Sequence, residues 1–330
     1  AGLVKYTGQT YHVFFHSLII DTDLAFDDKG HPASGYNEWM TTQSEFKKML
    51  PLFLENDFVL YDITWMCEYD EATGKVKQKD IYLPEGKKPL VISIDDVNYY
   101  DYMLGDGFAQ RLDVDENGKI VTHVGGTPVK RNGHIVDIKD YEVTYDGDVM
   151  PILDKFVEEN PDFSYKGAKG IVAVTGYEGA FGYNFIKDEE NKEKLKEEAT
   201  KVAQALKNNG WLIACHSYTH NDYFRDGGVK MEDLHYDTNR FKERIYDVVL
   251  KPDIYISPFG YHLNEGDERL MYLKEMGYSY FCPVSPVMRT YFTEEGVLMS
   301  ERFNLDRYNM RAKKDFINET FFDVDSVYYK

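Results

Sequence analysis

Two adjacent carboxylates, Asp95 and Asp96, directly follow the mostly apolar run Val-Ile-Ser-Ile at 91–94. Like charges at one site repel each other when water is excluded, and a bound cation relieves that repulsion. In a β/α barrel the carboxyl ends of the strands form the active face, so an acidic pair at this position is well placed for chemistry. The pair indicates a cation site, with a solvated turn as the other interpretation.

A second candidate lies in residues 215–220, which read Cys-His-Ser-Tyr-Thr-His. His216 and His220 are four positions apart, a spacing that lets two imidazoles bind one ion from a helix face or a strand-to-loop turn. Ser217 follows the first histidine, so this motif carries no glutamate base of the kind found in HExxH zinc proteases. An acidic ligand from residues 95–96 would complete a two-histidine, one-aspartate site and leave one carboxylate as a base.

The elements that would position these residues alternate between strand and helix patterns, which implies parallel β/α units in a barrel or an open sheet. We expect strands at 11–20, 58–63, 90–94, 170–175, 211–215, 254–257, 278–282 and 297–300. We expect helices at 42–55, 149–159, 188–208, 239–249 and 267–276.

Residues 106–145 interrupt this alternation with Asn-Gly and Gly-Gly steps between short β-like runs. Such steps are hairpin turn signals, so we expect two or three short antiparallel strands inserted into the α/β chain. Residues 21–36 read as a polar loop. We find no linker that would divide the chain, and we expect one domain over 1–330 with a β-rich insertion at 106–145.

The composition of the chain excludes several classes of protein function. The 330 residues are 43% hydrophobic and carry a formal net charge of −19. A chain of this composition can bury a large core, and its acidity argues against nucleic acid or an anionic membrane surface as a partner. No apolar run approaches the length of a spanning helix, and the three cysteines form no CxxC pair.

Taken together, these motifs resemble those of the polysaccharide deacetylase family, carbohydrate esterase family 4. In that family an Asp-Asp pair ends an apolar strand, an H(S/T)xxH motif follows, and a Pro-Tyr-Gly block lies downstream. Here residues 93–97 read Ser-Ile-Asp-Asp-Val, residues 216–220 match the histidine motif, and residues 258–260 read Pro-Phe-Gly. The resemblance implies a distorted (β/α) barrel of the deacetylase type.

The resemblance also implies roles for these residues. Asp95 would be the catalytic base, and Asp96, His216 and His220 would hold a divalent metal, zinc or alternatively cobalt or nickel. The backbone N–H of Phe259 would stabilise the oxyanion. Substrate-binding positions would be Pro258, Gly260 and Tyr99.

Three departures from the family pattern concern activity. Val97 replaces a usual glycine, Ile256 stands where the family carries an arginine that orients the base, and no histidine follows His262. Arg302 and Arg307 are candidates to replace that arginine. The poly-N-acetylglucosamine branch is similar in lacking the late histidine, and its first strand resembles residues 14–17. By that resemblance His16 is the general acid; the other interpretation is a core histidine bonded to backbone.

We therefore expect a metal-dependent hydrolase that removes N-acetyl groups from an amino-sugar polysaccharide. The alternatives are a catalytically impaired sugar-binding surface protein and an esterase that removes O-acetyl groups from xylan or another glycan. Because such polymers lie outside the cytoplasm, we expect a secreted or lipid-anchored monomer whose leader is absent from this sequence. Several aromatic residues beside the motifs, such as Tyr100 and Tyr102, could stack on sugar rings or simply belong to the core. The six remaining histidines are expected at the surface or in loops, at positions 12, 31, 123, 134, 235 and 262.

Overall fold

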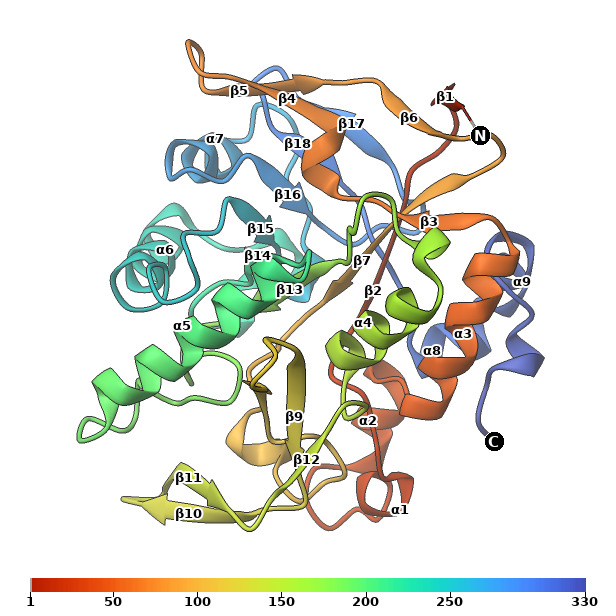
Figure 1. Ribbon diagram of the computed structural model, residues 1–330. Helices are drawn as coiled ribbons and strands as arrows, with labels where there is room; N and C mark the ends of the chain where they lie inside the picture. The colour runs from red at the N-terminus through yellow and green to blue at the C-terminus, as the bar shows by residue number, and fades with distance from the viewer. Residues whose placement is uncertain (1) are drawn as a thin grey trace.

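A computed structural model describes residues 2–330. Its centre is a curled sheet of ten strands (Figure 1). Nine of them follow one another in the order β17 (Thr290–Phe292), β18 (Leu298–Ser300), β16 (Tyr280–Cys282), β15 (Ile254–Ile256), β14 (Leu212–Cys215), β13 (Ile171–Val174), β7 (Lys88–Ile94), β2 (Tyr11–Phe15) and β19 (Phe303–Asn304). The tenth, β3 (Phe58–Leu60), pairs with the first part of β7. All pairings are parallel except that of β17 with β18.

The α/β class is confirmed. The sheet curls into a half-barrel, and the full distorted (β/α) barrel that the resemblance implied is not confirmed. Within residues 2–330 no ladder joins β17 to β19, the two ends of the sheet. The pairing of β18 explains this opening. Strands β16 and β17 occupy both edges of β18, so no edge remains for β19, which follows only two residues later.

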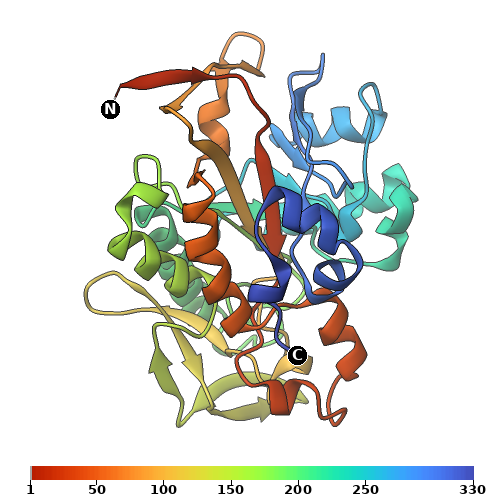
Figure 2. The same cartoon turned by 90° about the vertical axis from the view of Figure 1, so that its right-hand side faces the viewer.

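Five longer helices pack against the sheet (Figures 1 and 2). They are α3 (Gln43–Glu55), α4 (Val149–Glu159), α5 (Lys192–Asn208), α6 (Met231–Arg244) and α7 (Glu268–Glu275). Four of the five agree with the helices expected from the sequence, and Thr42 caps α3 through a capping box with Glu45. The expected helix 239–249 was misplaced, because α6 starts earlier and its buried Leu234 and Phe241 are separated by mostly polar residues.

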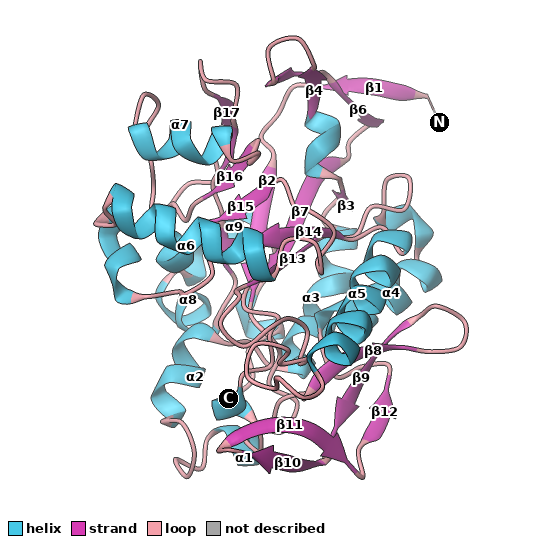
Figure 3. Ribbon diagram, turned by 90° about the vertical axis from the view of Figure 1, so that its left-hand side faces the viewer, coloured by secondary structure: helices cyan, strands magenta, loops and turns pink. Residues whose placement is uncertain are grey.

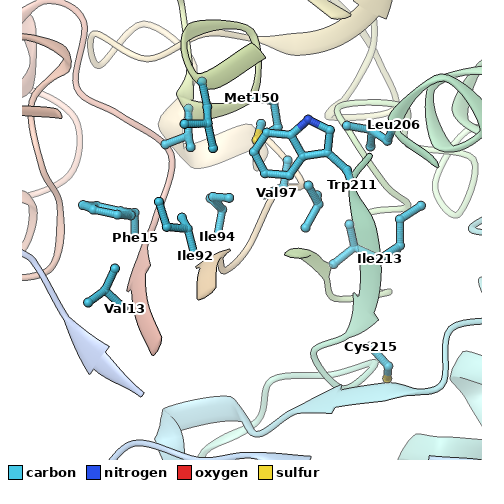
Figure 4. Packing of buried hydrophobic residues seen from close by; sticks show 14 of the residues in the cluster. Val13, Phe15, Ile92, Ile94, Val97, Met150, Leu206, Trp211, Ile213 and Cys215 are labelled. Carbon is cyan, nitrogen blue, oxygen red and sulfur yellow. The ribbon is translucent and has the colours of Figure 1, made fainter. Parts of the chain in front are cut away.

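The two faces of the sheet have different environments because successive side chains of a strand point to opposite faces. Ile92 and Ile94 of β7 belong to the large core between the sheet and the helices, which Figure 4 shows with Trp211. Val91, which precedes Ile92 and points the opposite way, belongs to a second apolar cluster on the other face. Ser93 is also fully buried.

The insertion contains more strands than expected (Figure 3). β8 (Arg111–Val114), β9 (Ile120–Val124) and β12 (Glu142–Thr144) form one small sheet, and β10 (Thr127–Arg131) and β11 (His134–Lys139) form a hairpin. Asn132 and Gly133 both have positive φ in the turn of that hairpin, as an Asn-Gly hairpin turn requires.

Several short elements did not appear in the sequence patterns. The expected polar loop contains α1 (Thr22–Ala25) and most of α2 (Ala33–Trp39), and the chain ends in α8 (Arg307–Ala312) and α9 (Lys314–Thr320). Two further strand pairs are β1 (Leu3–Tyr6) with β6 (Ile81–Pro84) and β4 (Cys67–Asp70) with β5 (Lys75–Gln78). Over residues 2–330 every helix falls short of the length and apolarity needed to cross a membrane.

Candidate metal centre

Three predicted ligands meet at the carboxyl edge of the sheet. Asp96 follows β7, and His216 follows β14, two strands that flank β13. One ligand atom from each of Asp96, His216 and His220 lies within 4.8 Å of the others. His216 Nε2 is 3.5 Å from Asp96 Oδ2. Parallel strands in adjacent positions end at the same edge, which is why residues far apart in the chain converge here.

The backbone around the ligands is held in an unusual conformation. Asp96, Ser217, His220 and Phe259 have φ values of 57°, 66°, 47° and 57°. This left-handed region is unfavourable for residues with a Cβ, at a cost on the order of 1–3 kcal/mol each, and such residues cluster at functional sites. Four of them around one centre indicate that packing enforces a geometry that local preference would not choose.

Hydrogen bonds orient two of the ligands. The Tyr100 hydroxyl donates to Asp96 Oδ1 at 2.7 Å, and Oδ2 faces His216. His216 Nδ1 is 2.8 Å from the Ile256 carbonyl, which can only accept, so Nδ1 carries the proton and Nε2 is free to bind a metal. From sequence alone Tyr100 was only a candidate for stacking on sugar rings, because its contact with Asp96 depends on the turn between them.

The loop that carries the histidines is fastened by Asp237 of α6. One carboxylate oxygen accepts from the backbone N–H of Tyr218 at 2.8 Å, and the other accepts from the N–H and hydroxyl of Thr219 at 2.8 and 2.6 Å. Asp237 is fully buried. Sequence analysis missed this residue, which lies in a run of polar residues that reads as a solvated helix face.

The predicted base, Asp95, lies beside the three ligands and is 3% exposed. Its Oδ2 is 3.9 Å from His216 Nε2, and its Oδ1 accepts a hydrogen bond of 2.7 Å from Arg302 Nη1. Arg302 lies between β18 and β19, is fully buried, and packs over the Phe14 ring at 4.0 Å. It therefore contacts the base as an orienting arginine would, from a different part of the chain than Ile256.

The other candidate arginine, Arg307, does not reach this centre. Its guanidinium donates to Glu45 Oε2 at 2.7 Å and to Asn37 Oδ1 at 2.8 Å. Glu45 is also buried, so this ion pair joins α8 to α3 and α2 as part of the fold.

His16 approaches the centre from the end of β2. Its Nδ1 lies 3.1 Å from the carbonyl oxygen of Trp39, and its Nε2 lies 3.6 Å from Asp96 Oδ2. Since the carbonyl can only accept, Nδ1 is the protonated nitrogen and Nε2 faces the metal ligands. The side chain is 18% exposed, so this is a histidine at the edge of the site rather than in the core.

The Pro-Phe-Gly sequence at residues 258–260 also lies at the centre. The Phe259 ring lies 4.4 Å from that of His220. Phe259 is the second residue of a short 3₁₀ segment, Pro258–Gly260, in which the Gly260 N–H donates to the Ser257 carbonyl at 3.0 Å. Pro258 is buried, and a Cβ on Gly260 would lie 2.4 Å from a Val284 methyl carbon. Close packing therefore accounts for the glycine.

Tyr99 does not fit its predicted role in substrate binding. The side chain is 4% exposed, and its hydroxyl donates to the buried carboxylate of Asp148 at 2.5 Å. Asp148 also accepts from the backbone N–H of Leu18 and Val149. Tyr99 thus points into the core, because its positive φ turns the chain immediately after the acidic pair.

Two of the six histidines that we expected at the surface or in loops are instead buried in strands. His12 is fully buried in β2, with its ring nitrogens 2.8 and 2.9 Å from the hydroxyls of Ser300 and Ser93. Burial, with a smaller contribution from Arg302, holds the pKa of His12 well below its usual value. His123 is 1% exposed and lies on β9 in the insertion. Both occupy strands whose polar partners cannot be read from local sequence.

The electrostatics suit cation binding. Burial raises the pKa of Asp96, but the nearby His216 and His220 outweigh it and hold that pKa far below its usual value. Burial lowers the pKa of His220. For His216 burial acts in the same direction, yet Asp95 and Asp96 together raise its pKa above the usual value. These shifts favour the ionised form of Asp96 and the neutral form of His220, which are the forms that bind metals. At His216 a metal would compete with a more tightly held proton.

Comparison with known proteins finds no matching family model, no similar curated protein and no similar solved structure. Two imidazoles and one carboxylate form a donor set suited to a divalent transition metal, and all three donors converge here.

Proposed function

We propose that this protein is a metal-dependent hydrolase that removes N-acetyl groups from an amino-sugar polysaccharide. One observation carries the proposal: Asp95, held by the buried Arg302, lies beside the converging side chains of Asp96, His216 and His220. A carboxylate that is not needed as a ligand, yet is fixed next to a metal site, suits a general base. The resemblance of the motifs to the polysaccharide deacetylases supplies the substrate class.

Zinc is the ion that we infer for the site, with cobalt or nickel as substitutes, because the donor set mixes imidazole nitrogen and carboxylate oxygen. A divalent ion held there would polarise the acetyl carbonyl and make water easier to deprotonate. Three protein ligands leave coordination positions open, as catalytic zinc sites do.

The residues of the chain would carry the proton transfers. Asp95 takes a proton from the attacking water, and the Phe259 N–H donates to the carbonyl oxygen as it gains negative charge. With both ring nitrogens protonated, His16 donates its Nε2 proton to the sugar nitrogen as the carbon–nitrogen bond breaks. Water and the amide are thereby converted to acetate and a free amine. Loss of a general acid of this kind slows turnover by roughly 10²–10⁴-fold.

The direct test is acetate release from a hexamer of β-1,6-linked N-acetylglucosamine, measured before and after treatment with a chelator and after zinc is restored. We expect chelation to abolish release and zinc to restore it. Asp95→Asn should release no acetate while keeping its metal. Wild-type rates in Asp95→Asn would show that the assigned base is wrong, and release from acetylated xylan alone would favour the O-acetyl esterase.

A further inference from the structure

Two large aromatic side chains near the metal centre remain exposed. Trp39 is 56% exposed and Tyr102 is 50% exposed. Each is one contact away from a residue of the centre. The Trp39 carbonyl accepts from His16, and the Tyr102 ring stacks on Tyr100, whose hydroxyl bonds Asp96. Single exposed apolar side chains are ordinary on protein surfaces, so their exposure bears on binding only because both rings lie beside the candidate centre.

Helix α2 connects these two side chains. The ring of His31, just before α2, lies 5.5 Å from Tyr102 and 4.7 Å from Tyr36. Trp39, the last residue of α2, contacts His16 through its carbonyl. The helix therefore runs from Tyr102 towards the proposed general acid.

Helix geometry fixes which side of α2 carries Trp39. Tyr36 is buried and its hydroxyl bonds Asp106, whereas Asn37 contacts Arg307 of α8. At about 100° per residue, Trp39 lies roughly 60° from Tyr36 and 160° from Asn37. Trp39 is thus directed closer to the side of Tyr36 than to the side of Asn37, which contacts α8.

We propose that Trp39 and Tyr102 bind pyranose rings beside the sugar unit that is deacetylated, so that the substrate is a glycan chain rather than a single sugar. The inference rests on the proposed function. Flat indole and phenol rings pack against the C–H face of a pyranose, while the sugar hydroxyls stay in water. The net charge of −19 is compatible with a neutral or partly deacetylated, cationic chain.

The test measures binding of the β-1,6-linked N-acetylglucosamine hexamer by calorimetry, with the full-length protein in an Asp95→Asn background to prevent turnover. We expect Trp39→Ala and Tyr102→Ala each to weaken binding by about three- to tenfold. Trp39→Tyr should retain most of the affinity. Tyr69→Ala is the matched control, because Tyr69 is 59% exposed on β4, far from α2 in Figure 1.

Tryptophan fluorescence gives a second readout. The three tryptophans of the chain are Trp39, Trp65 and Trp211, and Trp39 alone is strongly exposed. The hexamer should protect the protein from acrylamide quenching, and this protection should be absent in Trp39→Tyr. The monosaccharide N-acetylglucosamine should give little protection at the same concentration of sugar units.

The outcomes separate the inference from the proposed function. Trp39-dependent binding without acetate release in the wild-type protein would overturn the hydrolase and support the sugar-binding role. Acetate release with unchanged hexamer affinity and KM in both alanine variants would overturn the inference and leave the hydrolase standing. Equal kcat/KM for monosaccharide and hexamer would also overturn it.

Discussion

At the residue scale, the proposed chemistry depends on a buried ion pair that joins Asp95 to Arg302. Removing one member of a buried pair leaves an unpaired charge out of water, which is far more unfavourable than losing a surface pair. Arg302 also donates to the Cys282 carbonyl at 3.2 Å, so its guanidinium is fixed by the sheet as well as by the base. This geometry suits a positioning residue.

We expect Arg302→Met to lose acetate release and to lower the free energy of unfolding by about 3–5 kcal/mol. Arg302→Lys keeps the charge without the planar fork, and should fold while lowering kcat more than it changes KM. Arg311→Met is the control, because Arg311 is exposed and its guanidinium bonds Asn37 and Tyr328 rather than a buried carboxylate. Chemical denaturation and steady-state kinetics check these values.

A double variant distinguishes positioning from general stabilisation. Asp95→Asn removes the buried charge, so combining it with Arg302→Met should recover part of the lost stability without recovering activity. Wild-type kcat in Arg302→Lys together with wild-type stability in Arg302→Met would remove Arg302 from the mechanism.

At the scale of elements, helix α6 fastens the histidine loop through Asp237. Hydrogen bonds to a charged acceptor contribute about 1.5–3 kcal/mol each, and here they hold the loop that contains Ser217 and His220 in left-handed conformations. A helix whose sequence appears wholly solvated therefore helps to determine the geometry of the site.

We expect Asp237→Ala to reduce metal affinity by about 10–100-fold, because His220 would lose its fixed orientation. Asp237→Asn keeps one oxygen acceptor and should give an intermediate loss. Glu243→Ala, an exposed acidic position on the same helix, should behave as wild type. Competition with a fluorescent zinc chelator measures these affinities, and unchanged affinity in Asp237→Ala would show that the loop holds its shape without α6.

At the scale of the whole molecule, the metal centre joins separate parts of the sheet. Asp96 and His216 follow strands that are two positions apart, and β13 lies between them. A metal that binds only the folded protein stabilises it by mass action, by about 2.7 kcal/mol when the free metal is 100 times its Kd.

We expect zinc to raise the melting temperature of the wild-type protein and not that of His216→Ala. The rise should be larger at pH 8 than at pH 6. The raised pKa of His216 means that protons compete with the metal for its nitrogen more strongly as the pH falls. His235→Ala, an exposed histidine on α6, is the control, and an equal zinc effect in His216→Ala would refute the ligand assignment.

The sequence by itself located the metal ligands and the candidate base. Asp95 and Asp96 are neighbours, and His216 and His220 are four positions apart, so each half of the site is a local pattern. The alternation of apolar strands and helices also indicated the α/β class and placed both motifs at strand ends. The structure retains these features because each depends only on residues within a single strand, helix or loop.

Only the tertiary structure decided which other residues serve the site. Arg302 reaches Asp95 across 207 positions of the chain, and Asp237 and Trp39 make their contacts from helices with no local motif. Strand pairing decided the half-barrel as well, because β17 occupies the edge of β18 that a closed barrel would need. Such contacts depend on which elements become neighbours after folding, and no spacing within a single segment records that choice.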